Sequence, residues 1–206
     1  GPSARLALKA TGTCQVSVPE WLLDLDGPGH YRRRIKHVAL SIPSVAGPYT
    51  SVSSTLSLLS SSVRKSPIPK DGEYARQGSE DDRFVDYTGT VQSIVTSNAQ
   101  NDSGLFETNL RDERFLPFEG SGVISKWKLD LPKDYPSFDY RTIADVVLHL
   151  RYTARPGVET SKVKAALDDL FQDVRQTGLA ILFSLRFDFP SEWAKFSFGN
   201  DDFKDK

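Results

Sequence analysis

Apolar residues recur at every second position along much of the chain, and this period of two limits the possible folds more than any other feature. In one such run, Val38, Leu40 and Ile42 alternate with Ala39 and Ser41. The pattern is typical of β-strands that bury one face and expose the other. Longer runs fall at residues 38–42, 52–58, 123–131, 146–152 and 179–189, and shorter ones at 5–9, 13–18, 91–96 and 105–108.

One segment follows a helical period instead. Between residues 159 and 177, Val163, Leu167 and Leu170 recur three or four positions apart, and Gly178 follows as a stop signal. We therefore expect a mainly β fold, an antiparallel β-sandwich or half-open barrel with one amphipathic helix at about 159–177. The apolar stripe of this helix is expected to cover an open face or end of a sheet.

Length and composition are those of a globular domain. The chain has 206 residues, of which 38% are apolar and 26% charged, and its net charge is −1. It contains no methionine, and residues 1–3 (Gly-Pro-Ser) are typical of the remnant of a cleaved tag, so we expect a piece of a longer protein. We predict a single β-rich domain at residues 4–198, a long exposed loop within 60–86 and a flexible polar tail at 199–206.

The residue patterns that usually mark an active site are missing from the sequence. Gly120-Ser121-Gly122 lacks the spacing of a nucleophile elbow, and Cys14 lies in an alternating run where a buried thiol is the usual outcome. The three histidines lack the short spacing of metal ligands, and adjacent acids do not by themselves form a catalytic pair. We therefore predict no enzymatic activity, no cofactor and no metal site.

A short basic run at residues 32–36, Arg-Arg-Arg-Ile-Lys, is the strongest local concentration of charge. Nucleic-acid binding favours a longer basic stripe and a basic domain, whereas this chain is close to neutral, so no nucleic-acid partner is expected. We expect these cations to pair with acids at a sheet edge or across a subunit contact. The acids considered are Asp24, Asp26 and Asp139.

Several longer motifs follow one another in a fixed order along residues 13–190. They include Pro28-Gly29-His30-Tyr31, Gly47-Pro48-Tyr49-Thr50-Ser51-Val52, Gln100-Asn101-Asp102-Ser103-Gly104-Leu105-Phe106-Glu107, Arg111-Asp112-Glu113-Arg114-Phe115-Leu116-Pro117-Phe118 and Leu148-His149-Leu150-Arg151-Tyr152-Thr153-Ala154-Arg155. In wording and order they resemble the C-terminal TcB-binding domain of the A component (TcA) of tripartite Tc toxins. Gly27 departs from the likeness, because the family usually carries an aromatic residue before Pro-Gly-His-Tyr.

The resemblance implies a non-enzymatic docking module. In this family the A component is a homopentameric injection device, and its C-terminal domain binds the TcB subunit of a TcB–TcC cocoon that encloses the toxic cargo. By resemblance, the domain couples this cocoon to the pentameric translocation channel. It does so in a secreted or cell-surface toxin complex, with no direct membrane insertion by the domain itself.

Two groups of charged and polar residues are candidates for contacts. The polar loop is expected to supply specificity at the rim of a β-rich platform. The charged motif residues are expected to form fixed ion pairs or subunit contacts, because mixed charge beside buried aromatics needs pairing. The candidate partner interface is Tyr74, Arg76, Asp81, Asp82 and Arg83, and the candidate structural or subunit contacts are Arg32, Arg33, Arg34, Arg111, Asp112, Glu113 and Arg114.

An alternative function is open at this stage. A β-sandwich of this kind can also bind a carbohydrate or a host protein in a toxin-like protein that lacks a B component. Stacking on sugars needs solvent-facing aromatic side chains, so this alternative depends on Trp21 and Trp193. Burial of both indoles would count against it.

Overall fold

The computed structural model describes residues 2–44, 52–98, 117–133, 136, 138–157, 160–178 and 189–197. In chain order the elements are α1 (Pro2–Thr11), β1 (Thr13–Val18), α2 (Glu20–Asp24), β2 (Tyr31–Ser41), β3 (Val52–Arg64), β4 (Phe84–Asn98), β5 (Ile124–Asp130), the 3-10 helix η1 (Tyr140–Thr142), β6 (Val147–Arg155), α3 (Thr160–Thr177) and α5 (Pro190–Ser197). Within the described residues, no helix has the length and apolar character needed to cross a membrane.

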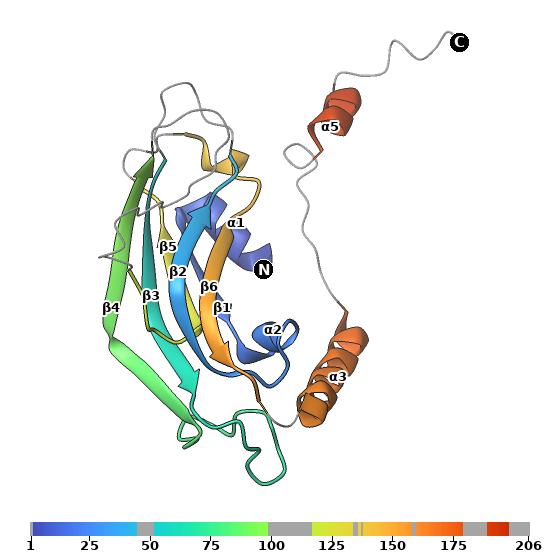
Figure 1. Cartoon of the computed structure of the whole chain (residues 1–206). Helices are drawn as coiled ribbons and strands as arrows, with labels where there is room; N and C mark the ends of the chain where they lie inside the picture. The colour runs from blue at the N-terminus through green and yellow to red at the C-terminus, as the bar shows by residue number, and fades with distance from the viewer. Residues whose placement is uncertain are drawn as a thin grey trace.

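The strands form two antiparallel sheets that face each other (Figure 1). One sheet has four strands in the order β1-β5-β3-β4, and the other pairs β2 with β6. The prediction of a mainly β, antiparallel fold is confirmed, and the sheets do not close into a barrel within the described residues. The alternating runs at 13–18, 38–42, 52–58, 91–96, 123–131 and 146–152 each fall on a strand.

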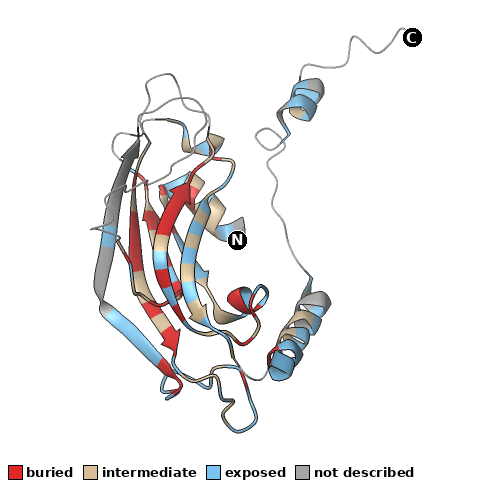
Figure 2. Cartoon of the chain, in the orientation of Figure 1, coloured by how far each residue is buried: buried red, intermediate tan, exposed pale blue. Residues whose placement is uncertain are grey.

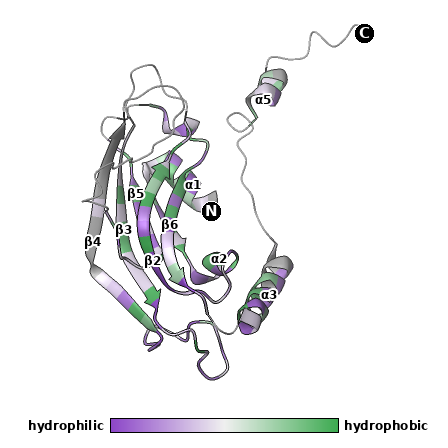
Figure 3. Ribbon diagram, viewed as in Figure 1, coloured by the Kyte–Doolittle hydropathy of each residue, from purple (hydrophilic) through white to green (hydrophobic). Residues whose placement is uncertain are grey.

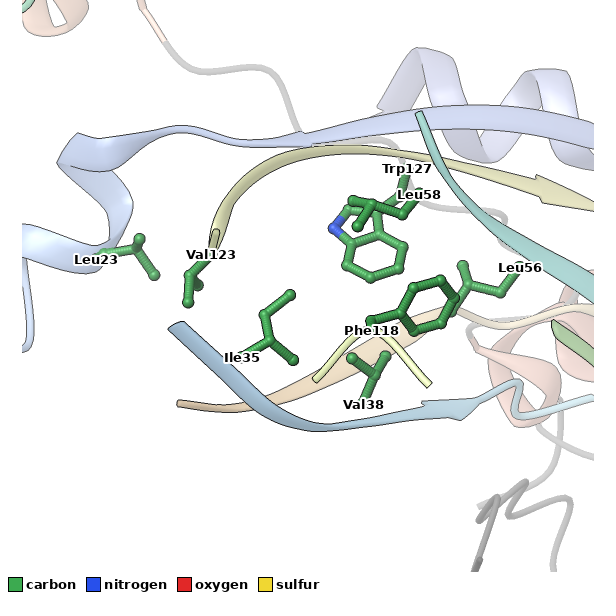
Figure 4. Packing of buried hydrophobic residues seen from close by; sticks show 8 residues of the cluster. All are labelled: Leu23, Ile35, Val38, Leu56, Leu58, Phe118, Val123 and Trp127. Carbon is green, nitrogen blue, oxygen red and sulfur yellow. The ribbon is translucent and has the colours of Figure 1, made fainter. Parts of the chain in front are cut away.

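The apolar faces of the strands meet in a core between the sheets. Figure 2 shows buried residues along the strands of both sheets. Trp127 of β5 is fully buried, and its ring lies edge-on to Phe118 with 4.9 Å between the ring centroids. Its indole nitrogen donates a hydrogen bond to Ser125 Oγ at 2.8 Å, so the buried polar atom is paired. Ile35 and Val38 of β2 complete this cluster from the facing sheet (Figure 4).

The strand predicted at residues 5–9 is wrong, because these residues belong to α1. Leu6 and Leu8 would share one face of a strand, yet Leu8 is fully buried and Leu6 is 54% exposed. A five-residue window holds too few apolar positions to separate the two periods, and Ala, Leu, Lys and Arg all favour helix. Gly12, at a φ of 72°, ends the helix by donating its N–H to the Leu8 carbonyl at 2.9 Å.

The predicted helix is confirmed as α3, and Gly178 follows it with a φ of 81°. Val163 in its first turn is buried and lies close to Gly29, whereas the other described side chains of α3 are half-buried or exposed (Figure 2). The structure has more helices than the one expected, because α1, α2, η1 and α5 are also present. These additional helices have at most ten residues, which is too short for a clear helical period.

Three predictions concern segments outside the described residues. They are the short strand at 105–108, the strand at 179–189 apart from its last residue, and the polar tail at 199–206. These stay predictions from the sequence.

Residues 120–123, called the crossing segment, connect the two sheets at one end. Its backbone bonds to β2 run from Ile35 N to Ser121 O at 2.8 Å, from Gly120 N to Ile35 O at 2.9 Å and from Val123 N to Arg33 O at 3.4 Å. Directly afterwards the chain pairs with β3, where Ile124 stands opposite Ser62. One stretch of chain thus bonds first to one sheet and then to the other, which closes the sandwich at this end.

Gly122 in the crossing segment is expected to tolerate no side chain. A Cβ there would lie 2.1 Å from the Ser62 carbonyl oxygen of β3, and backbone cannot move aside as a flexible side chain can. Gly122→Ala should therefore lower the free energy of unfolding by about 2 kcal/mol or more in a urea titration. Ser121→Ala is the control and should stay within about 0.5 kcal/mol of the unchanged chain. Equal stability of the two variants would contradict the close packing of the crossing segment.

Candidate functional site

The connection between β3 and β4, called the 65–83 loop, is an ordered structure with its own buried residues. Sequence analysis predicted a long exposed loop within 60–86, but residues 60–64 and 84–86 belong to strands. Within the loop, Tyr74, Asp81 and Arg83 are buried. Because buried charges and hydroxyls need partners, these residues fix the path of the loop.

Arg64, the last residue of β3, anchors the loop to α2. Its guanidinium donates to both carboxylate oxygens of Glu20, with Nε to Oε1 at 2.6 Å and Nη2 to Oε2 at 2.7 Å, and Nη2 also donates to the Tyr74 carbonyl at 2.9 Å. The same group lies over the rings of Tyr74 and Phe84, 4.2 and 4.4 Å from their centroids. Burial lowers the pKa of Arg64, but the hydrogen bonds and charge of Glu20 outweigh it, so the pKa is raised.

Asp24, at the end of α2, forms a second buried centre beside the first. Its carboxylate accepts hydrogen bonds from Arg33 Nη2 at 2.6 Å, from the Tyr74 hydroxyl at 3.0 Å and from the Gly29 N–H at 3.2 Å. Burial raises the pKa of Tyr74, and the nearby charges of Glu20 and Asp24 raise it further. The Tyr74 hydroxyl therefore remains a donor, and it ties the 65–83 loop to α2 and β2.

Arg83 and Asp81 organise the far side of the loop. Arg83 Nη2 and Asp81 Oδ2 are 2.6 Å apart, and Arg83 also donates to the carbonyl oxygens of Glu73, Tyr74 and Ala75. Asp81 accepts in addition from the backbone N–H groups of Gln77 at 2.9 Å and Arg83 at 3.0 Å. The hydrogen bonds from Arg83 hold the pKa of Asp81 well below its usual range. The Arg83 guanidinium thus binds three carbonyl oxygens of the loop while it pairs with Asp81.

The outer surface of the loop is polar and carries charges of both signs. Arg76 pairs with Asp86 and lies 4.8 Å from the Phe84 ring centroid, and Lys70 pairs with Asp82 at 2.9 Å. Ile68 is 68% exposed beside these charges. The exposed acids of the loop are Asp71, Glu73, Glu80 and Asp82.

The five residues predicted as a partner interface thus occupy different positions. Tyr74, Asp81 and Arg83 face the inside of the loop, Arg76 is half-buried, and Asp82 is exposed. Their contact with a partner stays a prediction. Arg64, Glu20 and Phe84 also belong to this network but were not predicted, because no local pattern links residues so far apart in the chain.

The basic run at residues 32–36 divides between the core and the surface. Arg33 is buried and pairs with Asp24, as expected for one of the acids considered, whereas Arg32 and Arg34 are exposed. Arg34 donates to the Gly120 carbonyl at 2.7 Å. Lys36 pairs with Glu119 at 3.0 Å, and Asp139 pairs with Arg141 at 3.1 Å. The other candidates in this group, Arg111, Asp112, Glu113 and Arg114, lie outside the described residues.

Gly27, at which the chain departs from its motif likeness, lies in a tight turn. A Cβ at Gly27 would lie 2.7 Å from the His30 ring, and the Gly27 carbonyl accepts a hydrogen bond from Arg33 at 2.7 Å. The turn therefore closes tightly over the buried Arg33–Asp24 pair.

Trp21 is one of the two tryptophans on which the carbohydrate-binding alternative depends. It lies at the surface and is 41% exposed. Its neighbours Leu22 and Leu25 are also exposed, and Figure 3 shows hydrophobic residues on α2. Sugar sites add polar groups to a stacking ring, whereas an apolar surface of this kind favours protein contact.

The combination of the fold and the loop is typical of a binding domain. No group of three or more His, Cys, Asp or Glu is placed to hold a metal ion in the part of the chain that the structure describes. The buried acids Asp24 and Asp81 pair with Arg33 and Arg83. Both arginines also donate to backbone carbonyl oxygens, so the two ion pairs stabilise the fold. A rigid β-scaffold that presents an ordered polar loop is typical of recognition domains.

Comparison with known proteins identifies the family. The family model described as "Tc toxin complex TcA C-terminal TcB-binding domain" matches residues 1–154, and the chain belongs to this family. The resemblance inferred from the ordered motifs is thereby confirmed.

The chain is also similar to individual proteins and solved structures. The chain is 41% identical over 133 residues to toxin subunit YenA2 of Yersinia entomophaga, a match that covers 63% of this chain and 10% of that protein. Among solved structures, Yersinia pseudotuberculosis TcaA-TcaB matches at 26% identity with a TM-score of 0.42, covering 69% of this chain and 7% of that one. Morganella morganii TcdA4 matches at 21% identity with a TM-score of 0.38, covering 72% and 6%. The chain spans a tenth or less of the length of these relatives.

Arg64→Lys should destabilise the domain although it keeps the charge. A lysine cannot donate to both Glu20 oxygens while lying flat between two rings, so we expect a loss of about 2–4 kcal/mol in urea unfolding. Arg76→Lys is the matched control, because Arg76 also stacks on Phe84 but pairs with Asp86 near solvent. It should cost less than about 1 kcal/mol. Equal losses would show that burial of Arg64 is not what matters.

The low pKa of Asp81 predicts a loss of stability in acid. Its contribution is fully present above the unfolded-state pKa, near 4, and is lost as the pH falls toward the lower folded-state pKa, because only the unfolded chain binds the proton readily. Asp81→Asn should remove this part of the pH dependence in unfolding measured from about pH 6 downwards. Asp71→Asn controls for removal of one exposed loop charge. An unchanged pH slope in Asp81→Asn would refute the prediction.

Proposed function

We propose that this domain binds the TcB subunit of a TcB–TcC cocoon and couples the cocoon to the channel of a pentameric A component. The observation that carries the proposal is the match of residues 1–154 to the TcB-binding family. The matched region includes the whole 65–83 loop and all but the last residue of β6.

The outer surface of the 65–83 loop is the partner contact that we propose. Ile68 offers an exposed apolar side chain on the loop that also carries the exposed acids Asp71, Glu73, Glu80 and Asp82. Interfaces commonly combine an apolar centre with a polar rim. The surface that it fits is a basic patch of TcB with a shallow apolar pocket. In this arrangement Tyr74, Asp81 and Arg83 position the loop, and Asp82 and Arg76 face the partner.

The buried ion pairs support such a role because they fix the loop before binding. Ordering a flexible loop costs free energy on association, and a loop that is already ordered avoids that cost. Arg64, Asp24 and Arg83 hold the loop from three sides. Affinity then depends on the outer side chains and not on folding of the loop.

A pentameric ring makes modest single contacts sufficient. Five linked copies raise the effective concentration of each further contact once one copy is bound, so one isolated domain binds more weakly than the ring. The proposed role is non-enzymatic, in a secreted or cell-surface toxin complex. The family description, which names binding and no reaction, supports it.

Binding to a purified TcB–TcC cocoon tests this function directly. Five copies of the domain held on a pentameric scaffold should retain the cocoon on a biosensor, and a single copy should retain it less well. No retention by the five-copy assembly of cocoons from several Tc toxins, including a cognate one, would overturn the proposal.

Asp82→Lys in the five-copy assembly is expected to slow association with the cocoon. A rim charge acts mainly through long-range attraction, so the association rate should fall by about tenfold at low salt and less at high salt. Asp168→Lys on α3 makes the same charge change on an exposed residue outside the loop and serves as the control. Equal rates for the two variants would exclude the outer loop surface as the contact.

A further inference from the structure

A polar pocket, called the Arg34 pocket, lies where the crossing segment meets β2, β3 and β4. It has a volume of about 520 Å³, which falls in the usual range of small-ligand sites, about 300–1,000 Å³. The lining residues that the argument uses are Arg34, Ser61, Asp86, Tyr87, Glu119 and Ser121.

The strand irregularity beside the pocket places an aromatic ring next to small hydroxyl side chains. The register of β3 with both β4 and β5 shifts between Leu58 and Ser60. Just beyond this shift, Ser61 stands opposite Tyr87 of β4, so their side chains share one face of the sheet. Ser61 is buried, whereas Tyr87 is 48% exposed. The pocket therefore combines an accessible ring with a hydroxyl group beside it.

Arg34 supplies the uncompensated charge of the pocket. Its Nη1 donates to the Gly120 carbonyl at 2.7 Å, which holds the guanidinium against the crossing segment, and it forms no ion pair within the described residues. The two acids of the lining are already paired, Glu119 with Lys36 and Asp86 with Arg76. A guanidinium offers five N–H donors in a planar fork that matches a carboxylate. The charge of the pocket thus favours an anionic group as ligand.

The remaining groups match the chemistry of a sugar ring. A sugar has an apolar face that stacks on an aromatic ring and a rim of hydroxyls that both donate and accept hydrogen bonds. The Ser61 and Ser121 hydroxyls can bond such a rim as donors or acceptors, and the carboxylates of Asp86 and Glu119 can accept from it. Stacking, hydroxyl partners and one cation are therefore present in a single pocket.

We propose that the Arg34 pocket binds a saccharide that carries a carboxylate. The sugar carboxylate pairs with Arg34, and one face of the ring lies on Tyr87. An acidic peptide would use Arg34 but leave the exposed ring and the hydroxyls without a role, so a saccharide is favoured. The pocket also differs from the surface at Trp21, whose exposed neighbours Leu22 and Leu25 offer no side-chain hydrogen bonds. This inference does not depend on the binding of TcB.

Calorimetric titration of the full 206-residue chain with simple glycosides tests the proposal. The acidic probes are methyl β-D-glucuronide and the methyl glycoside of N-acetylneuraminate, and the neutral probe is methyl β-D-glucoside. At least one acidic probe should bind about tenfold or more tightly than the neutral one, because the carboxylate adds two charge-assisted hydrogen bonds. The tighter of the two acids identifies the sugar. Equal binding of acidic and neutral glycosides would overturn the proposal.

Acetate tests whether the carboxylate alone is recognised. It should bind at least about tenfold more weakly than the preferred acidic glycoside, because it cannot stack on Tyr87 or reach the hydroxyls. Acetate that binds as tightly as the glycoside would show a site for carboxylates in general, and the saccharide assignment would be overturned.

A matched pair of arginine variants assigns the charge. Arg34→Gln should remove the preference for the acidic glycoside, whereas Arg32→Gln makes the same charge change at an exposed arginine of the same strand and should leave the preference within about twofold. If Arg34→Gln does not fold, Arg34→Lys keeps the charge without the fork and should still weaken the acidic glycoside by about fivefold. Equal effects at positions 34 and 32 would contradict the proposal.

A second pair tests the stacking. Tyr87→Ala should weaken both acidic and neutral glycosides by about tenfold, and Tyr87→Phe, which keeps the ring, should stay within about threefold of the unchanged chain. Equal affinity of the Ala and Phe variants would exclude Tyr87 as the stacking ring and overturn the assigned geometry.

Discussion

Two buried arginines, each held by an acid of α2, determine how the closed end of this domain is arranged. Arg64 reaches Glu20 and stacks on Tyr74, while Arg33 reaches Asp24, which also accepts the Tyr74 hydroxyl. Removing one partner of such a pair leaves a buried charge uncompensated, which is costly. These ion pairs therefore couple the positions of α2, β2, β3 and the 65–83 loop. The shape of the outer loop surface depends on the same contacts.

The same end of the molecule holds the crossing segment. Gly120, Ser121 and Val123 form backbone hydrogen bonds with β2 immediately before the chain joins β3. Backbone pairing between the sheets is thus concentrated beside the charged network, whereas side-chain packing around Trp127 holds the sheets together further along. On the side of β1 and β6, where an apolar gap lies, no backbone hydrogen bond joins the two sheets within the described residues.

Sequence patterns located the strands and the long helix α3, but not the four shorter helices α1, α2, η1 and α5. Alternation located the strands around Val38, Leu56 and Trp127, since one buried face per strand leaves a signal in adjacent residues. It failed at residues 5–9, where a short run did not distinguish helix from strand. The loop network was invisible for a different reason: Glu20, Arg64 and Tyr74 are brought together only by the tertiary fold. The ordered motifs identified the family, which composition and periodicity could not.

The crossing segment also has a mechanical consequence. A force on the 65–83 loop is transmitted to β3 through the hydrogen bond between Arg64 and the Tyr74 carbonyl. It is transmitted to α2 and β2 through the hydrogen bonds of Asp24 with Tyr74 and Arg33. Both sheets then bear the load at the end where hydrogen bonds of Gly120 and Val123 join them. A force applied at this loop is therefore expected to load both sheets together and not to separate one from the other.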